Sequence, residues 1–164
     1  MKILVTGGAG YLGSVLVSRL LWHDCRDFHV TVLDSFRHGV PSLAMHGANR
    51  NLTVVRGNLV REPGLFRRLV LEADAVVHLA ALVGASICEA HPEDAFHLNQ
   101  RATENLVAWL PRGRLVVFPC TNSGYGKGGA QPVTEADPMV PLSLYGRTKV
   151  AAERAVLGAG GVSL

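Results

Sequence analysis

The first thirteen residues constrain the fold of this chain more than any other stretch, because a short apolar run leads there directly into a cluster of glycines. The run Ile3–Val5 is long enough for a buried strand and too short for a helix. From Tyr11 to Leu21 the apolar residues continue at helical spacing. A strand, a glycine turn and a helix in succession form the context in which a glycine-rich motif binds phosphate, since the helix N-terminus offers free N–H groups to an anion.

The spacing of the glycines fits a dinucleotide-binding fingerprint in two ways. Gly8, Gly10 and Gly13 match its general form, whereas Gly7, Gly10 and Gly13 match a variant. Such glycines permit a tight turn, let a pyrophosphate approach the backbone and let the helix pack closely on the strand. The alternative is a glycine turn without a ligand in an unrelated α/β protein.

A second apolar run, Val30–Leu33, adds weight to the fingerprint because it ends in a carboxylate, Asp34. Asp34 lies 21 residues after Gly13, close to the spacing of about 20 expected for the group that binds an adenosine ribose. The negative charge of Asp34 would repel the 2′-phosphate of NADP, so the sequence predicts NAD as the cofactor. Arg37 and His38 lie near enough in the chain to soften that preference.

Apolar runs alternate with helical patterns along the whole chain, which predicts a Rossmann-type, doubly wound parallel sheet with helices on both faces. We expect residues 1–164 to form one NAD-binding domain that stops in its sixth strand. The expected strands are Ile3–Val5, Val30–Leu33, Leu52–Val55, Ala75–Leu79, Leu115–Phe118 and Val162–Leu164, and the expected helices are Tyr11–Trp22, Glu62–Leu71, a long stretch from Pro92 to Leu110, and Leu144–Leu157.

Composition excludes several classes of function. The net charge of +3 is spread along 164 residues without a lysine-arginine block, which argues against nucleic-acid binding. No apolar run reaches membrane-spanning length, and we expect no signal peptide because a strand begins at residue 2. Cys25, Cys88 and Cys120 share no metal-ligand spacing and indicate free thiols in a reducing cytoplasm. We expect no metal site.

The candidate catalytic residues lie near the end of the chain. Tyr145 and Lys149 are four residues apart, so they share one face of the last expected helix. A nearby ammonium would lower the high pKa of a tyrosine, and the resulting phenolate can take a proton from a substrate hydroxyl while hydride leaves the same carbon. Thr121, just past the fifth strand, could hydrogen-bond the substrate oxygen, although Ser123 competes for this role. Taken alone, the Tyr145–Lys149 spacing is more typical of a solvated helix face. Its place after a strand that ends in hydroxyl residues, within an expected dinucleotide fold, favours catalysis.

Several of these motifs resemble, in the same order, the extended short-chain dehydrogenase/reductases, which include NAD-dependent nucleotide-sugar epimerases and dehydratases. The resemblance covers essentially the whole chain but only the N-terminal half of the family, and it therefore implies that the C-terminal substrate domain of the family is absent. The matching segments are Thr6-Gly-Gly-Ala-Gly-Tyr-Leu-Gly13, His78-Leu-Ala-Ala81, Asn99 with Thr103 and Asn105, Pro132-Val-Thr-Glu135, and Pro141-Leu-Ser-Leu-Tyr-Gly-Arg-Thr-Lys149.

The resemblance implies a role for each matching residue. By it, Thr121 and Tyr145 would carry catalysis, and Lys149 would also bind the nicotinamide ribose. The implied cofactor contacts are Gly7, Gly10, Tyr11, Leu12 and Gly13 at the pyrophosphate, Asp34 at the adenosine ribose, Asn58 and Leu59 beside the adenine, Leu79, Ala80 and Ala81 along the central channel, and Asn99, Tyr145 and Lys149 near the reacting end.

The chain also departs from the family pattern. Asn58 stands where the family usually has Asp, and Cys88 where Ser is frequent. The segment Thr121–Ser123 lacks the Asp-Glu pair of the 4,6-dehydratases. The resemblance therefore implies a nucleotide-sugar epimerase, with a dehydratase, a reductase or a cofactor-binding module without activity as alternatives. It also implies a homodimer formed through the helices near residues 92–110 and 143–157.

Overall fold

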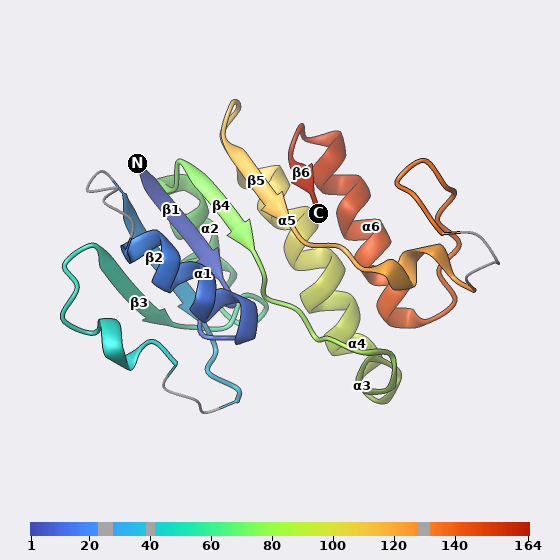
Figure 1. Ribbon diagram of the computed structural model, residues 1–164, viewed down its shortest axis with the longest axis horizontal. Helices are drawn as coiled ribbons and strands as arrows, with labels where there is room; N and C mark the ends of the chain where they lie inside the picture. The colour runs from blue at the N-terminus through green and yellow to red at the C-terminus, as the bar shows by residue number, and fades with distance from the viewer. Residues whose placement is uncertain (23–27, 39–41, 128–131) are drawn as a thin grey trace.

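Six parallel strands form one sheet in the order β3-β2-β1-β4-β5-β6 (Figure 1). The computed structural model describes residues 1–22, 28–38, 42–127 and 132–164. Every described strand pair is parallel, so the predicted doubly wound sheet is confirmed. The strands are β1 (Lys2–Thr6), β2 (His29–Asp34), β3 (Leu52–Arg56), β4 (Ala75–His78), β5 (Leu115–Phe118) and β6 (Val162–Ser163).

The strand order reverses between β1 and β4. β1 pairs with β2 on one side and with β4 on the other, with Thr6 opposite His78 in the second pairing. In open α/β sheets, ligands bind beyond the carboxyl ends of the strands at such a reversal. The glycine turn after β1 and the segment after β4 therefore meet where a dinucleotide is expected.

Each face of the sheet has its own apolar core, because side chains alternate between faces along a strand. Ile3 and Val5 face α1 (Tyr11–Trp22) and pack with Val17, whereas Leu4 and Val76 face α2 (Pro63–Glu72), α5 (Ala102–Trp109) and α6 (Leu144–Gly158). Helices thus cover both faces, as predicted. The larger core also contains Leu33, Leu59, Phe66, Leu69, Val70, Ala73, Ala102, Leu106, Val116, Phe118, Ala152 and Val156.

The long helix predicted from Pro92 to Leu110 is wrong in detail. The structure divides this stretch into α4 (Pro92–Ala95), a π-helical turn η2 (Phe96–Arg101) and α5, and it adds α3 (Ala85–Ala90) before them. The Ala102 N–H donates to the carbonyl of His97, the five-residue spacing that defines a π turn. A four-residue apolar repeat does not distinguish an α turn from a π turn.

Short helical elements lie in two of the remaining loops. η1 (Ala44–His46) follows β2, and η3 (Asn122–Tyr125) follows β5. The Ser143 hydroxyl caps α6 by accepting from the Gly146 N–H at 3.0 Å. The predicted bounds of the other helices and strands agree with the structure to within one or two residues, although parts of the loops at 35–41 and 126–129 lie outside the described residues.

Candidate active site

The glycine turn has no room for side chains. Gly7 has a φ of +69°, and a Cβ there would lie 2.7 Å from the Ala80 nitrogen after β4. A Cβ at Gly13 would lie 2.5 Å from the Cα of Gly8. The Gly10 N–H donates to the Gly7 carbonyl at 3.0 Å, which closes the turn. This arrangement leaves the backbone at the start of α1 open to a pyrophosphate, so the turn fits a dinucleotide.

Two residues of this turn project outward. The side chains of Tyr11 and Leu12 are 89% and 60% exposed. Their backbone N–H groups belong to the first turn of α1, where such groups have no partner within the helix. The backbone of these residues, rather than their side chains, is thus suited to the pyrophosphate role that the resemblance implies.

Asp34 lies directly beside the glycine turn. One carboxylate oxygen accepts from the Ala9 N–H at 2.9 Å, and the other accepts from the Phe36 N–H at 2.7 Å. Phe36 has a φ of +54°, a conformation that side-chain-bearing residues seldom adopt. These two bonds fix the carboxylate at the end of β2, next to the site where a ribose would follow the pyrophosphate.

The two residues assigned to the adenine have different environments. The side-chain oxygen of Asn58 accepts from the N–H groups of Val60 and Arg61 at 2.9 and 3.0 Å. Leu59 is buried and packs in the larger core. The Leu59 side chain therefore supports the site from behind, and adenine contacts of these residues stay a prediction.

Asn99 joins the segment after β4 to α6. Its side-chain oxygen accepts from the Leu82 N–H at 2.7 Å, and its amide nitrogen donates to the Leu82 carbonyl at 3.0 Å. The same nitrogen lies 3.4 Å from the Thr148 hydroxyl on α6, and the Cys88 thiol also donates to the Leu82 carbonyl at 3.2 Å. The buried amide thus fixes the Leu79–Leu82 segment, and its predicted contact with the cofactor stays a prediction.

Tyr145 and Thr121 face one another near the carboxyl edge of the sheet. Burial raises the pKa of the Tyr145 phenol, and its interaction with the Thr121 side chain opposes that rise. The Thr121 hydroxyl also accepts from the Ser123 N–H at 3.2 Å, which starts η3. The structure brings these two predicted residues together, with the phenol protonated at neutral pH.

The Lys149 ammonium contacts the end of β5 and the residue that follows it. Its ammonium donates to the Pro119 carbonyl at 2.6 Å and lies 3.7 Å from the centre of the Phe118 ring. Burial lowers the pKa of Lys149 to about 8, while Cys120 and Glu153 oppose that fall. The predicted effect of this ammonium on Tyr145 stays a prediction.

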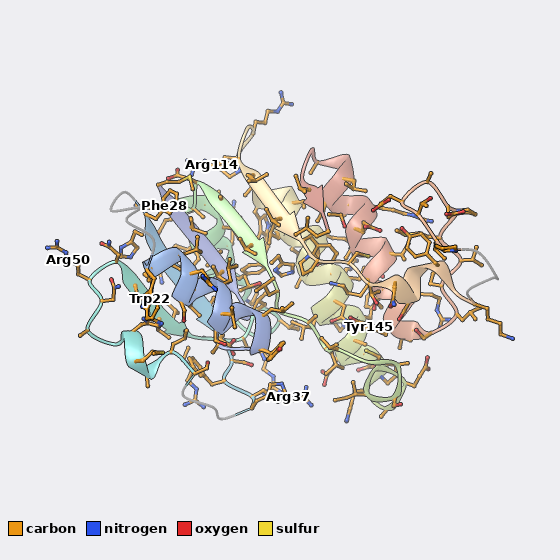
Figure 2. The ribbon with its side chains drawn as sticks, in the orientation of Figure 1. Trp22, Phe28, Arg37, Arg50, Arg114 and Tyr145 are labelled. Carbon is orange, nitrogen blue, oxygen red and sulfur yellow. The ribbon has the colours of Figure 1, made fainter. Side chains whose placement is uncertain are left out.

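The candidate residues lie at one edge of the sheet. Figure 2 shows Tyr145 and Arg37 beyond the edge toward which the arrows of β1 and β4 point, and Arg114 at the opposite edge. At that opposite edge the Arg114 guanidinium forms an ion pair with Asp74 at 2.7 Å. The site chemistry and this ion pair are thus separated by the length of the strands.

Comparison with known proteins identifies the family. Residues 3–161 match the model of the NAD dependent epimerase/dehydratase family. The chain belongs to this family.

Curated relatives are identical to this chain at about a third of the aligned residues. A UDP-glucose 4-epimerase from Corynebacterium glutamicum is 35% identical over 164 residues, which is 95% of this chain and 46% of the relative. A 3 beta-hydroxysteroid dehydrogenase/Delta 5-->4-isomerase from Mycobacterium tuberculosis is 33% identical over 98% of this chain and 43% of the relative. The chain therefore spans about half the length of the curated relatives that it matches.

Solved structures of the family share the fold. A UDP-glucuronic acid 4-epimerase from Bacillus cereus, in complex with UDP-glucuronic acid and NAD, superposes with a TM-score of 0.84 at 27% identity. The match covers 99% of this chain and 55% of that protein. The family fold thus extends through essentially all of this chain.

One set of buried residues was not assigned a role from the sequence. His78 is 1% exposed, and its Nδ1 lies 2.7 Å from the Thr6 hydroxyl while its Nε2 lies 3.1 Å from the Thr103 hydroxyl. Burial lowers the pKa of His78 to about 3, and the charge of Lys149 acts in the same direction. The register that places His78 opposite Thr6 is seen only in the structure, and the sequence alone shows no more than a histidine inside an apolar run.

The cysteines give no sign of a catalytic role. Burial raises the pKa of the Cys120 thiol to about 11, which argues against a nucleophilic role. Cys25 lies outside the described residues.

Within the described ranges, no group of three or more His, Cys, Asp and Glu side chains could hold a metal ion. No helix in those ranges has the length and apolar character needed to cross a membrane.

Proposed function

We propose that this chain is the NAD-binding part of a nucleotide-sugar 4-epimerase. The observation that carries the proposal is the close fit between the glycine turn and the segment after β4, with Asp34 fixed beside it. The epimerase relatives, and an epimerase structure that holds NAD and UDP-glucuronic acid, support the same interpretation.

The cofactor would lie across the end of the sheet at the strand reversal. Gly7, Gly10 and Gly13 would admit the pyrophosphate, and the N–H groups of Tyr11 and Leu12 would bind it. The remaining contacts would follow the order already given: Asp34 at the adenosine ribose, Asn58 and Leu59 near the adenine, Leu79, Ala80 and Ala81 along the channel, and Asn99, Tyr145 and Lys149 toward the nicotinamide.

The catalytic proposal assigns one proton transfer to Tyr145. Its phenolate would take the proton of the sugar 4-hydroxyl, while Thr121 would hydrogen-bond the same oxygen. NAD, when bound, supplies the acceptor for the hydride that leaves this carbon and returns to its other face. Lys149 would turn from the Pro119 carbonyl toward the ribose and Tyr145, where its charge would lower the pKa of the phenol.

Incubation of the chain with NAD and either UDP-glucose or UDP-galactose tests this proposal. We expect interconversion of the two sugars, and we expect Tyr145→Phe to keep NAD binding while losing at least about a hundredfold in turnover. The matched control is Tyr125→Phe, which also removes one phenol but lies on η3. Turnover of Tyr145→Phe at the wild-type rate would refute the catalytic assignment.

A cofactor-binding module without catalysis is the second candidate, because the chain spans about half the length of its relatives. NAD binding without detectable conversion of UDP-glucose, UDP-galactose or UDP-glucuronic acid would favour the module. Oxidation of a 3-beta-hydroxysteroid without sugar conversion would instead favour the dehydrogenase relatives.

We further propose a homodimer in the cytoplasm. α5 and α6 are neighbours on one face of the sheet, and residues of both are exposed, including Asn105 on α5 and Arg154 on α6. The free thiols Cys88 and Cys120 suit a reducing compartment. Sedimentation of the wild-type chain, compared with an Asn105→Glu variant, tests the dimer, because opposed carboxylates near a two-fold axis would weaken it.

A further inference from the structure

The Leu79–Leu82 segment is held to the protein at two points, one at each end. The Leu79 N–H donates to the Thr6 carbonyl at 3.0 Å, a backbone bond that does not involve His78. At one end, the Ala80 N–H donates to the Thr6 hydroxyl at 3.3 Å. At the other end, the Asn99 side chain brackets Leu82 with two hydrogen bonds. Under the proposed function this segment lines the cofactor channel, so the groups that hold it set the shape of that channel.

His78 lies between these two points of attachment. Its ring is stacked between Phe66 and Phe118, with centroids 6.1 Å away on each side. The ring nitrogens contact Thr6 on β1 and Thr103 on α5. The imidazole is therefore fixed in orientation and is the group that connects Thr6 with the end of the π turn.

The hydrogen bonds determine which ring nitrogen carries the proton. The Thr103 hydroxyl donates to the Asn99 carbonyl at 3.0 Å, and a carbonyl can only accept. The Thr103 oxygen must then accept from His78, which places the ring proton on Nε2. The bare Nδ1 accepts from the Thr6 hydroxyl, whose oxygen in turn accepts from the Ala80 N–H.

We propose that His78 is a positioning residue that holds the cofactor segment in place, as the neutral Nε2–H tautomer linking Thr6 to Thr103 and Asn99. In this arrangement every hydroxyl in the chain both donates and accepts, and each bond polarises the next. Asn99 takes part at two places, because its carbonyl accepts from Thr103 while its side chain brackets Leu82. The expected effect of His78 on NAD binding rests on the proposed function, whereas its hold on the Leu79–Leu82 segment does not.

Thr103→Val tests the proposal, because valine keeps the shape of threonine and removes the hydroxyl on which both Nε2 and the Asn99 carbonyl depend. We expect hydrogen exchange at the Leu82 amide to become at least about tenfold faster relative to the amides of β1, which corrects for any global loss of stability. We also expect the NAD dissociation constant to rise by about tenfold or more, and Thr103→Ser to restore both quantities.

The matched control is another histidine-threonine pair. His29 Nε2 lies 2.8 Å from the Thr53 hydroxyl in an exposed position on β2 and β3. Thr53→Val removes the same hydroxyl there, and it should leave Leu82 exchange and NAD binding unchanged. Thr6→Val breaks the His78 chain at its other end and replaces Thr103→Val if that variant does not fold.

The nitrogen chemical shifts of His78 in the wild-type chain provide a readout that does not involve NAD. We expect a protonated Nε2 and a bare Nδ1 throughout the range from pH 5 to pH 8. A protonated Nδ1, or unchanged relative exchange of Leu82 in Thr103→Val, would overturn the positioning role. Failure of the wild-type chain to bind NAD would refute the proposed function instead, and exchange at Leu82 would still decide the role of His78.

Discussion

The two halves of the candidate site consist of different chemical groups. Around the glycine turn, backbone N–H groups, close backbone contacts and one fixed carboxylate make up the site. Around Tyr145, side chains make up the site, and they are not yet arranged for reaction: the phenol is protonated and the Lys149 ammonium faces the Pro119 carbonyl.

This difference separates a region that is formed by folding from one that depends on its ligands. A backbone turn has a fixed geometry once the strand and helix around it are packed. A lysine has several rotamers, and a bound ribose would compete with the Pro119 carbonyl for its ammonium. We therefore expect cofactor binding to precede activation of Tyr145.

The largest expected effect comes from filling the glycine turn. In Gly13→Ala the added Cβ would collide with the backbone of Gly7 and Gly8, so we expect NAD affinity to fall by more than about a hundredfold and the free energy of unfolding to fall by about 1–3 kcal/mol. Calorimetric titration and denaturant unfolding measure both.

Gly64→Ala is the matched control for this variant. It also lies in a helix, but a Cβ there meets nothing within 4 Å. Alanine should raise the free energy of unfolding by about 0.5–1 kcal/mol and leave NAD affinity unchanged. Equal behaviour of the two variants would show that the turn is not a steric cradle.

The next largest expected effect is a loss of stability at acidic pH caused by His78, the histidine that connects the two regions. The pKa of His78 is lowered to about 3 in the folded chain, from 6.5, so the unfolded state binds more protons between these values. Stability is therefore lost as pH falls below about 6.5, by about 1.4 kcal/mol for each pH unit from this group. Urea unfolding at pH 7.5, 6 and 5 measures the slope.

His78→Gln is the comparison variant for this slope. We expect it to be less stable than wild type at pH 7.5 and to have a shallower pH dependence below 6.5. An unchanged slope in this variant would assign the acid sensitivity to other groups.

Lys149→Met separates the effect of the buried ammonium on stability from its effect on NAD binding. Burial of the ammonium lowers the pKa of Lys149 to about 8 from 10.5, so the charge destabilises the fold at pH 7. We expect the variant to gain about 1–3 kcal/mol in free energy of unfolding at pH 7 while binding NAD more weakly.

The pH dependence of this gain provides the check. Between pH 8 and 10.5 the unfolded wild-type chain binds more protons than the folded chain, so wild-type stability rises with pH and the difference between the two proteins should shrink. A variant that is less stable than wild type at pH 7 would show that the contacts of the ammonium with Pro119 and Phe118 outweigh the cost of burying it.

The smallest expected effect concerns the choice between NAD and NADP. Asp34→Asn removes the charge that would repel a 2′-phosphate, and we expect the preference for NAD to fall by about tenfold. Asp137→Asn is the matched control, because Asp137 also accepts from a backbone N–H, that of Thr134, but on a distant loop. An unchanged preference in Asp34→Asn would show that Asp34 does not bind the adenosine ribose.

The same difference explains what the sequence could and could not predict. The order of strands and helices, the glycine turn and Asp34 follow from local patterns of apolar residues and glycines. The π turn at Phe96–Arg101 leaves the four-residue apolar repeat unchanged, and the hydrogen bonds of His78 join residues far apart in sequence, such as Thr6 with His78. The rotamer of Lys149 could not be predicted, because it depends on competition between Pro119 and a ligand.

The most direct test of the central claim is calorimetric titration of the folded chain with NAD and, separately, with NADP. If folding alone completes the region around the glycine turn, we expect NAD to bind with a dissociation constant on the order of micromolar and NADP to bind more weakly. A chain with the dispersed amide spectrum of a folded protein that binds neither dinucleotide would contradict the claim.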